Sequence, residues 1–214
     1  MDMEAVIFDM DGVIFDSERL VYEGWKALSV KYGFDNLDEI YMKCIGVNSA
    51  TCRQIYLDFY GEDFPYDKYR QERSDDYHAR YSGGRLPMKA GVEELLKYLK
   101  ETGYKIAIAS STRSALVKEQ IEDAGLMKYF DVIVGGDQVK KSKPEPDIFL
   151  KAAELLGVKP ENAYVIEDSY NGIRAAKSAH MRPIMVPDMV QPDEEMQDKA
   201  WKICDSLKDI ITLI

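Results

Sequence analysis

Short apolar runs alternate with amphipathic stretches along most of the chain. Each run is bounded by polar or turn residues, and Leu, Ile and Ala recur at helical spacing in the stretches between them. The pattern predicts strands over residues 5–9, 105–110, 131–134, 163–167 and 183–186, and helices over residues 91–101, 113–124, 146–156 and 171–179. Such an alternation predicts an α/β fold with a doubly wound parallel sheet.

Residues 16–86 interrupt the alternation, because they are rich in Tyr, Asp, Glu and Arg at helical spacing and contain no convincing buried strand. We expect them to form a small helical domain inserted after the first strand, while residues 1–15 and 87–214 form the core domain. Most aromatic residues of the insert are expected in its own core. Residues 82–87 and 13–16 are the expected hinges. Residues 201–214 are expected to form a strand and a closing helix.

Acidic residues follow two of the expected strands. Asp9 and Asp11 end the first one, and side chains at i and i+2 of an extended backbone point the same way. Glu167 and Asp168 end the strand that starts at residue 163. The carboxyl ends of parallel strands meet at the edge where doubly wound folds bind ligands. Either acidic pair alone could be a solvated strand end, and the presence of both favours a functional site.

A serine and a lysine add possible phosphate ligands. Ser110 ends a buried strand, and its hydroxyl and the following N–H groups can hold phosphate oxygens or cap the next helix, two roles that are compatible. Lys143 precedes Pro144 and Pro146, which fix the backbone and would present its charge to a phosphate. An ordinary surface lysine is the alternative.

Four motifs in this order resemble the haloacid dehalogenase superfamily. They are Asp9-Met10-Asp11-Gly12-Val13, Ala109-Ser110-Ser111-Thr112, Lys143-Pro144-Glu145-Pro146-Asp147, and Glu167-Asp168-Ser169 followed by Gly172. The resemblance is to its phosphatase branch with a helical C1-type cap, near beta-phosphoglucomutase and the sugar-phosphate phosphatases. It implies a Rossmann-like core, Asp9 as covalent nucleophile and Asp11 as general acid and base. Ser110, Ser111 and Lys143 would bind the phosphate.

The charges of this set require a cation. Four ionised carboxylates (Asp9, Asp11, Glu167 and Asp168) beside a phosphate dianion would sum to about −6. Protonated Asp11, the Lys143 ammonium and Mg²⁺ would bring the total to about −2, and an all-oxygen ligand set suits Mg²⁺. The resemblance implies carboxylate ligands from Asp9 and Asp168, the main-chain carbonyl of Asp11, and Glu167 directly or through water.

Members of this branch either hydrolyse phosphate esters or isomerise sugar phosphates, and the sequence offers evidence on which activity to expect. The mutase typically has a histidine soon after the first motif and basic residues around a Gly-Val pair in the cap. Residues 16–21 contain no histidine and residues 44–49 contain no lysine or arginine. This favours a phosphatase for a small phosphate monoester, a sugar phosphate being the expected type, over a hexose-phosphate mutase or a non-catalytic phosphometabolite-binding protein. Glu18 is expected to face the substrate, although an ordinary exposed helix position is nearly as compatible.

Composition and charge exclude other classes. The net charge of −10 gives no basic footprint for nucleic acid. The apolar runs are too short to cross a membrane, and the acidic start differs from a signal peptide. Three cysteines without a C-x-x-C pair are expected to be reduced thiols. We therefore expect a cytoplasmic monomer whose partner is a small phosphorylated metabolite.

Overall fold

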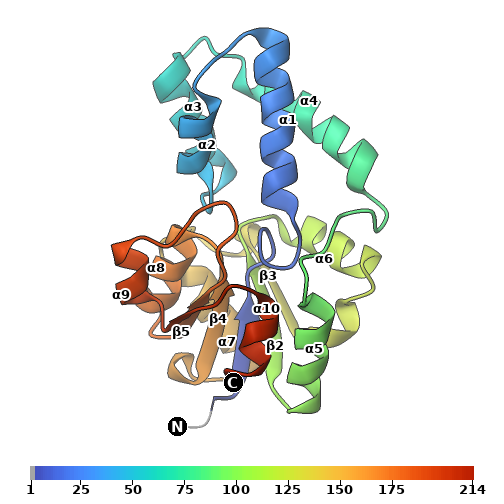
Figure 1. Ribbon diagram of the computed structural model, residues 1–214, viewed down its shortest axis with the longest axis vertical. Helices are drawn as coiled ribbons and strands as arrows, with labels where there is room; N and C mark the ends of the chain where they lie inside the picture. Colours follow the sequence, from blue (N-terminus) through green and yellow to red (C-terminus); the bar gives the residue numbers. More distant parts are fainter. Residues whose placement is uncertain (1–2) are drawn as a thin grey trace.

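The computed structural model describes residues 3–214, which form a sheet flanked by helices and a separate group of four helices above it (Figure 1). The strands are β1 (Ala5–Phe8), β2 (Lys105–Ser110), β3 (Val132–Gly135), β4 (Ala163–Glu167), β5 (Arg182–Met185) and β6 (Lys202–Ile203). They are all parallel, in the order β3-β2-β1-β4-β5-β6. The predicted doubly wound sheet is confirmed, with β1 at its centre.

The two faces of the sheet bury alternate residues of each strand. On β1, Val6 and Phe8 pack under α5 (Val92–Glu101), α6 (Ser114–Asp123) and α10 (Leu207–Ile211). Ala5 and Ile7 face the other way, under α7 (Asp147–Leu156) and α8 (Tyr170–Ser178). All four β1 side chains are fully buried, which is why this strand is a continuous apolar run in the sequence rather than an alternating one.

The expected core elements are found with boundaries shifted by at most one residue, and β6 followed by α10 forms the expected C-terminal strand and helix. One α-helix was not expected, α9 (Glu194–Lys199). Its six residues are too few to show a periodicity, and its position is set by the Asp193 side chain, which accepts the Met196 N–H, and by burial of Met196. Three short 3₁₀ turns, at Met127–Tyr129, Gly136–Gln138 and Pro160–Asn162, were also not expected.

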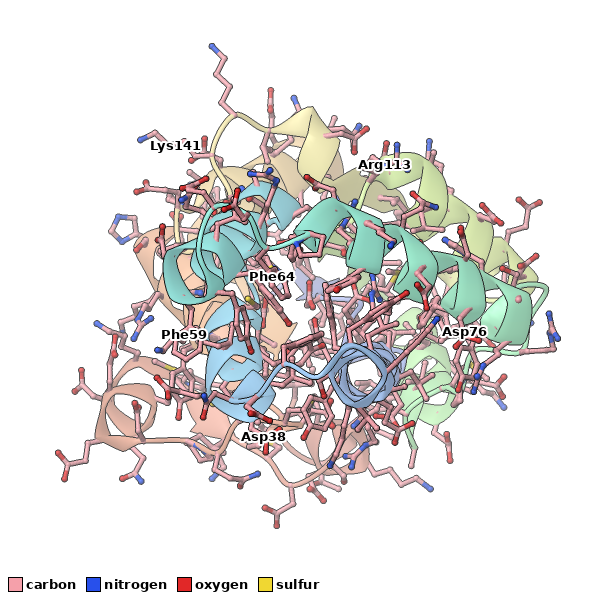
Figure 2. The ribbon with its side chains drawn as sticks, turned by 90° about the horizontal axis from the view of Figure 1, so that it is seen from above. Asp38, Phe59, Phe64, Asp76, Arg113 and Lys141 are labelled. Carbon is pink, nitrogen blue, oxygen red and sulfur yellow. The ribbon has the colours of Figure 1, made fainter. Side chains whose placement is uncertain are left out.

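The insert contains α1 (Ser17–Tyr32), α2 (Leu37–Cys44), α3 (Ser49–Tyr60) and α4 (Tyr66–Tyr81). We propose residues 16–86 as one cap domain and call them the cap. Its core is aromatic, as expected: the Trp25 ring lies 4.7 Å from that of Tyr56 and 5.4 Å from that of Tyr66. Figure 2 looks down on the cap, with α1 seen end-on and α4 running across the view. Tyr77 and Tyr81 differ from this pattern, since they pack on the core cluster under the cap.

The two connections between cap and core run side by side. Phe15 forms an isolated antiparallel bridge with Met88, and the Lys89 N–H donates to the Ile14 carbonyl. The Lys89 ammonium lies 2.6 Å from a carboxylate oxygen of Asp188, a side chain that is only 2% exposed. This ion pair therefore fastens the second connection to the loop after β5. Within residues 3–214 no helix is long and apolar enough to cross a membrane.

Removal of the Lys89 charge tests this attachment. We expect Lys89→Met to lower the free energy of unfolding by about 1–2 kcal/mol, because the buried Asp188 carboxylate loses its closest cation and keeps only Arg19, at 3.6 Å. Lys97→Met is the control, since Lys97 is 70% exposed and 3.9 Å from Glu101, and should change stability by less than about 0.5 kcal/mol. Urea unfolding of both variants measures the difference, and equal losses would contradict the assigned role.

Candidate active site

The site lies at the carboxyl end of β1, between β2 and β4. Phe8 is level with Ile108 of β2 and Ile166 of β4, so Asp9 follows at the height of Glu167, which ends β4, and one residue before Ser110 ends β2. The Asp9 N–H continues the ladder to the Ile166 carbonyl. At this edge the crossovers leave in opposite directions, which opens a crevice in doubly wound sheets.

Lys143 lies in the middle of the site and is 4% exposed, so the surface alternative is wrong. Its ammonium is 2.6 Å from Asp9 Oδ1, 2.6 Å from Glu167 Oε1 and 3.2 Å from the Ala109 carbonyl. These three acceptors use all three of its N–H donors. Burial opposes its charge, but the two carboxylates raise the pKa of Lys143 above the ordinary lysine value. The lysine is therefore a fixed cation that holds two acids together.

The buried environment of Asp9 disfavours its ionised form. Burial raises its pKa to about 8, the Lys143 ammonium lowers it, and the charges of Glu167 and Asp11 add to the increase. Lys143 alone therefore does not compensate for the desolvation of Asp9. A further positive charge near Asp9 would favour its ionised form.

Glu167 is fully buried and accepts hydrogen bonds on both oxygens. Oε1 accepts from Lys143, and Oε2 accepts from the N–H groups of Asp168 and Ser169 and from the Ser169 hydroxyl. Gly172, in the first turn of α8, leaves the space for this carboxylate, since a Cβ there would lie 1.8 Å from Glu167 Cδ. The Glu-Asp-Ser motif and its following glycine thus form one packed unit.

Asp168 has a buried carboxylate oxygen, Oδ2, that forms no hydrogen bond within the described residues, 3–214. Burial, then the charges of Glu167 and Asp9, hold its pKa well above the usual range. One oxygen each from Asp9, Glu167 and Asp168 lie within 4.8 Å of one another. Three buried carboxylates with an unused oxygen fit a hard divalent cation such as Mg²⁺.

Asp11 is held by hydroxyl groups instead of by a cation. Ser17 donates to its Oδ1 at 2.6 Å, while Thr112 and Ser110 donate to its Oδ2 at 3.0 and 3.3 Å. The Ser110 hydroxyl is fully buried and also accepts the Thr112 N–H. Ser111 lines the cavity next to it. The structure thus places Ser110 and Ser111 beside Asp11, with Ser110 linking the β2 end to that acid.

A cavity of about 750 Å³ opens between cap and core, with Asp9, Asp11, Lys143 and Asp168 in its wall. Glu18 of α1 also lines it and accepts a hydrogen bond from the Tyr41 hydroxyl at 2.9 Å. Burial and the Asp11 charge raise the pKa of Glu18 to about 7, against the effect of the Tyr41 hydrogen bond. The structure brings every site residue expected from the sequence to this cavity or directly behind it.

Sequence reasoning missed the basic residues of the cap wall, Arg70 and Arg73 of α4. The Arg73 stem packs on Gly24 of α1, and its buried Nε has no hydrogen-bond partner in the described part of the chain. α4 is polar except for Tyr66, Tyr69, Tyr77 and Tyr81, whose helical spacing marks the side that packs inward. The i, i+3 spacing of the two arginines was the available signal, because such residues share one helix face.

The fold and this constellation define a hydrolase of the haloacid dehalogenase type. Residues 6–186 match the family described as haloacid dehalogenase-like hydrolase, and the chain belongs to that family. A phosphorylated carbohydrates phosphatase of Thermotoga maritima is 37% identical over 85% of this chain and 84% of its own length. The resemblance drawn from the four motifs is therefore confirmed, as is the prediction of an enzyme that hydrolyses phosphoric monoesters.

Two solved structures show the same fold over nearly the whole chain. The beta-phosphoglucomutase of Clostridium difficile is 28% identical with a TM-score of 0.78, covering 97% of this chain and 93% of the other. A mutant of CbbY from Rhodobacter sphaeroides, in complex with xylulose-(1,5)bisphosphate, is 27% identical with a TM-score of 0.79, covering 96% and 95%. The relatives of this chain thus include one named as a phosphatase and one named as a phosphoglucomutase.

Substitution of Gly172 tests the packing around Glu167. In an ordinary helix position Gly→Ala stabilises by about 1 kcal/mol, but here we expect Gly172→Ala to destabilise by about 2–3 kcal/mol, because the methyl group displaces the buried carboxylate. The comparison is Gly24→Ala in α1, where the new Cβ would lie 2.8 Å from Arg73 Cγ and the side chain must shift slightly, so a smaller loss of about 1 kcal/mol is expected. Thermal unfolding measures both, and a stabilised Gly172→Ala variant would contradict the packing.

Proposed function

We propose that the protein is a Mg²⁺-dependent phosphatase that hydrolyses a small phosphate monoester, of the sugar-phosphate type, through a phospho-aspartate. The observation that carries the proposal is the arrangement of Asp9 and Asp11. The two acids open into one cavity, Lys143 holds one oxygen of Asp9, and three hydroxyls hold Asp11. A nucleophile and an acid are thus positioned separately on one strand end.

Asp9 and Asp11 would divide the reaction between them. With Oδ1 fixed by Lys143, Asp9 attacks phosphorus through Oδ2, so that an O–P bond forms and the ester P–O bond breaks. Asp11 gives its proton to the leaving alkoxide, then takes one from the water that cleaves the acyl phosphate. The Ser17 and Thr112 hydroxyls keep its two oxygens in place through both steps.

The phosphate would be held by the groups after β2 and by Lys143. Ser111 and Thr112 line the cavity beside Asp11, so their side of the β2 end is the expected oxygen cradle. Lys143 can donate a hydrogen bond to a phosphate oxygen only if it breaks one of its three present hydrogen bonds. Its longest one, 3.2 Å to the Ala109 carbonyl, is the one most readily exchanged.

Asp9, Asp168 and the main-chain carbonyl of Asp11 would hold Mg²⁺, which would offset the acidic charge and polarise the phosphoryl group. The unused Oδ2 of Asp168 supports this set. Glu167 fits a water-mediated place better than a direct one, because four donors already occupy its two oxygens.

The cap supports a substrate with polar groups beyond the phosphate. Glu18 and Tyr41 line the cavity on one side, and Arg70 and Arg73 line it from α4. Together they offer acceptors and donors for sugar hydroxyls, which fits the Thermotoga maritima relative named for phosphorylated carbohydrates. A cytoplasmic location and a monomeric state remain predictions from the sequence.

A hexose-phosphate mutase is the second candidate. The 44–49 loop lacks basic residues, but Arg70 and Arg73 bring two guanidinium groups to the cavity from α4. These groups could hold the second phosphate that a mutase requires. Incubation with β-glucose 1-phosphate and its bisphosphate activator distinguishes the two, since glucose 6-phosphate formed faster than free phosphate would establish the mutase.

Asp9→Asn and Asp11→Asn test the divided roles. With Mg²⁺ and a panel of sugar phosphates, we expect Asp9→Asn to lose about 10³-fold or more of phosphate release, because the amide cannot form the acyl phosphate. Asp11→Asn should lose about 10²–10⁴-fold and retain substrate binding. Asp16→Asn serves as the control for loss of an acid outside the cavity wall, since Asp16 is partly exposed at the hinge and pairs with Arg19. Full turnover by Asp9→Asn would eliminate the covalent mechanism.

Arg73→Met tests the cap wall. Loss of its guanidinium should lower kcat/KM for sugar phosphates by about 10–100-fold, the usual range for a charge-assisted hydrogen bond. Arg80→Met on the same helix is the matched control, since Arg80 is 64% exposed and paired with Asp76, and should change kcat/KM by less than about two-fold. If both variants hydrolyse sugar phosphates equally well, Arg73 does not contact the substrate.

A further inference from the structure

Two of the three cysteines meet in the cap wall, a proximity that their spacing in the sequence does not indicate. Cys44 ends α2 and Cys52 lies in the first turns of α3, and both line the cavity. Cys44 Sγ is 3.9 Å from the Cys52 carbonyl oxygen, and Cys52 Sγ accepts a hydrogen bond from the Tyr66 hydroxyl at 3.5 Å. The third cysteine, Cys204, is buried in the core domain.

The surroundings of the two cysteines shift the pKa values of their thiols in opposite directions. The hydrogen bond from Cys44, then that from the Tyr66 hydroxyl and the charges of Arg73 and Arg70, lower the pKa of Cys52 despite its burial. The same pairing and burial raise the pKa of Cys44. Cys52 is thus favoured as the thiolate, which is the reactive form, and Cys44 remains a neutral neighbour.

The segment between the cysteines is one of the parts of the cap that contact the core. Gly46 packs so closely on Ser169 that a Cβ would lie 2.6 Å from its Oγ, and the Asn48 side chain donates to the Ser142 hydroxyl at 2.9 Å. Ser169 in turn donates to Glu167, the partner of Lys143. A change in this loop therefore reaches the residues that hold Asp9.

We propose that Cys44 and Cys52 are a redox modification site, where a hydroperoxide converts the pair to a disulfide that fixes residues 45–51 and slows turnover. The bond would fix the end of α2 to the first turn of α3 and constrain the loop between them, whose Gly46 packs against Ser169 without spare room. The formation of the bond rests on the proximity of the two cysteines in the cavity wall, and its effect on turnover rests on the proposed function.

The reaction balances with one peroxide per pair. The Cys52 thiolate attacks one oxygen of hydrogen peroxide, the O–O bond breaks, and hydroxide leaves and takes up a proton, which gives a sulfenic acid and water. The Cys44 thiol then attacks the sulfenic sulfur, so that the S–S bond forms, the S–O bond breaks and water leaves with the Cys44 proton. Two thiols are oxidised and the peroxide is reduced to water.

Peptide mapping after peroxide treatment tests the bond in the unmodified protein. Mass spectrometry should find a Cys44–Cys52 cross-linked peptide, absent after treatment with dithiothreitol, while Cys204 remains a thiol. Amide hydrogen exchange over residues 45–51 should become slower when the bond forms. Neither readout requires a substrate, so both stand even if no phosphate ester is hydrolysed. Peroxide that leaves both cysteines as thiols, or oxidises them without a cross-link, overturns the proposal.

Turnover of a chromogenic aryl phosphate tests the consequence. We expect peroxide to lower kcat by roughly ten-fold or more, with recovery on reduction, because the loop displacement reaches Glu167 and Lys143. Cys52→Ser should keep its own untreated rate under peroxide, and Cys204→Ser should respond as the wild type does. Equal peroxide losses in wild type and Cys52→Ser would show that the disulfide does not control turnover.

Discussion

The arrangement of the site depends on one buried ammonium that lies between two carboxylates. Lys143 is 2.6 Å from both Asp9 and Glu167, and all three side chains are almost completely removed from water. Two ionised acids so close together would repel each other strongly in a medium of low dielectric constant. The lysine makes their shared burial possible, and its removal would leave two charges without compensation, a costly state in a protein interior.

The architecture around this triad follows from that constraint. Because β1 pairs with β4, Asp9 lies next to Glu167, the last residue of β4. The backbone of residues 168 and 169 turns its N–H groups toward Glu167, and Gly172 leaves room for the carboxylate. Even so, the pKa of Asp9 is raised by burial and that of Asp168 stays well above normal. The remaining excess of negative charge is what a divalent cation would neutralise.

The sequence predicted the strands and the strand-end acids because both depend on local signals. A fully buried strand is a continuous apolar run, and the acids follow directly, so Asp9, Asp11, Glu167 and Asp168 could be placed at one edge without coordinates. Lys143 could be found only by its motif, since nothing local distinguishes a buried lysine from an exposed one. Arg73 and the Cys44–Cys52 pair were out of reach, because their positions depend on how four cap helices pack. The short α9 was missed because six residues carry no measurable period.

The cap and the charge balance of the site are physically linked. Gly46 of the cap contacts Ser169, whose hydroxyl donates to Glu167, and Glu167 shares Lys143 with Asp9. Closure that removes water from the cavity strengthens each of these interactions, because their screening falls with the local dielectric constant. A cap that withdraws gives up the contact to Ser169 and readmits water beside Asp9 and Asp168. The ionisation of Asp9 and Asp168 therefore depends on the position of the cap, although no cap side chain among residues 3–214 hydrogen-bonds to Asp9.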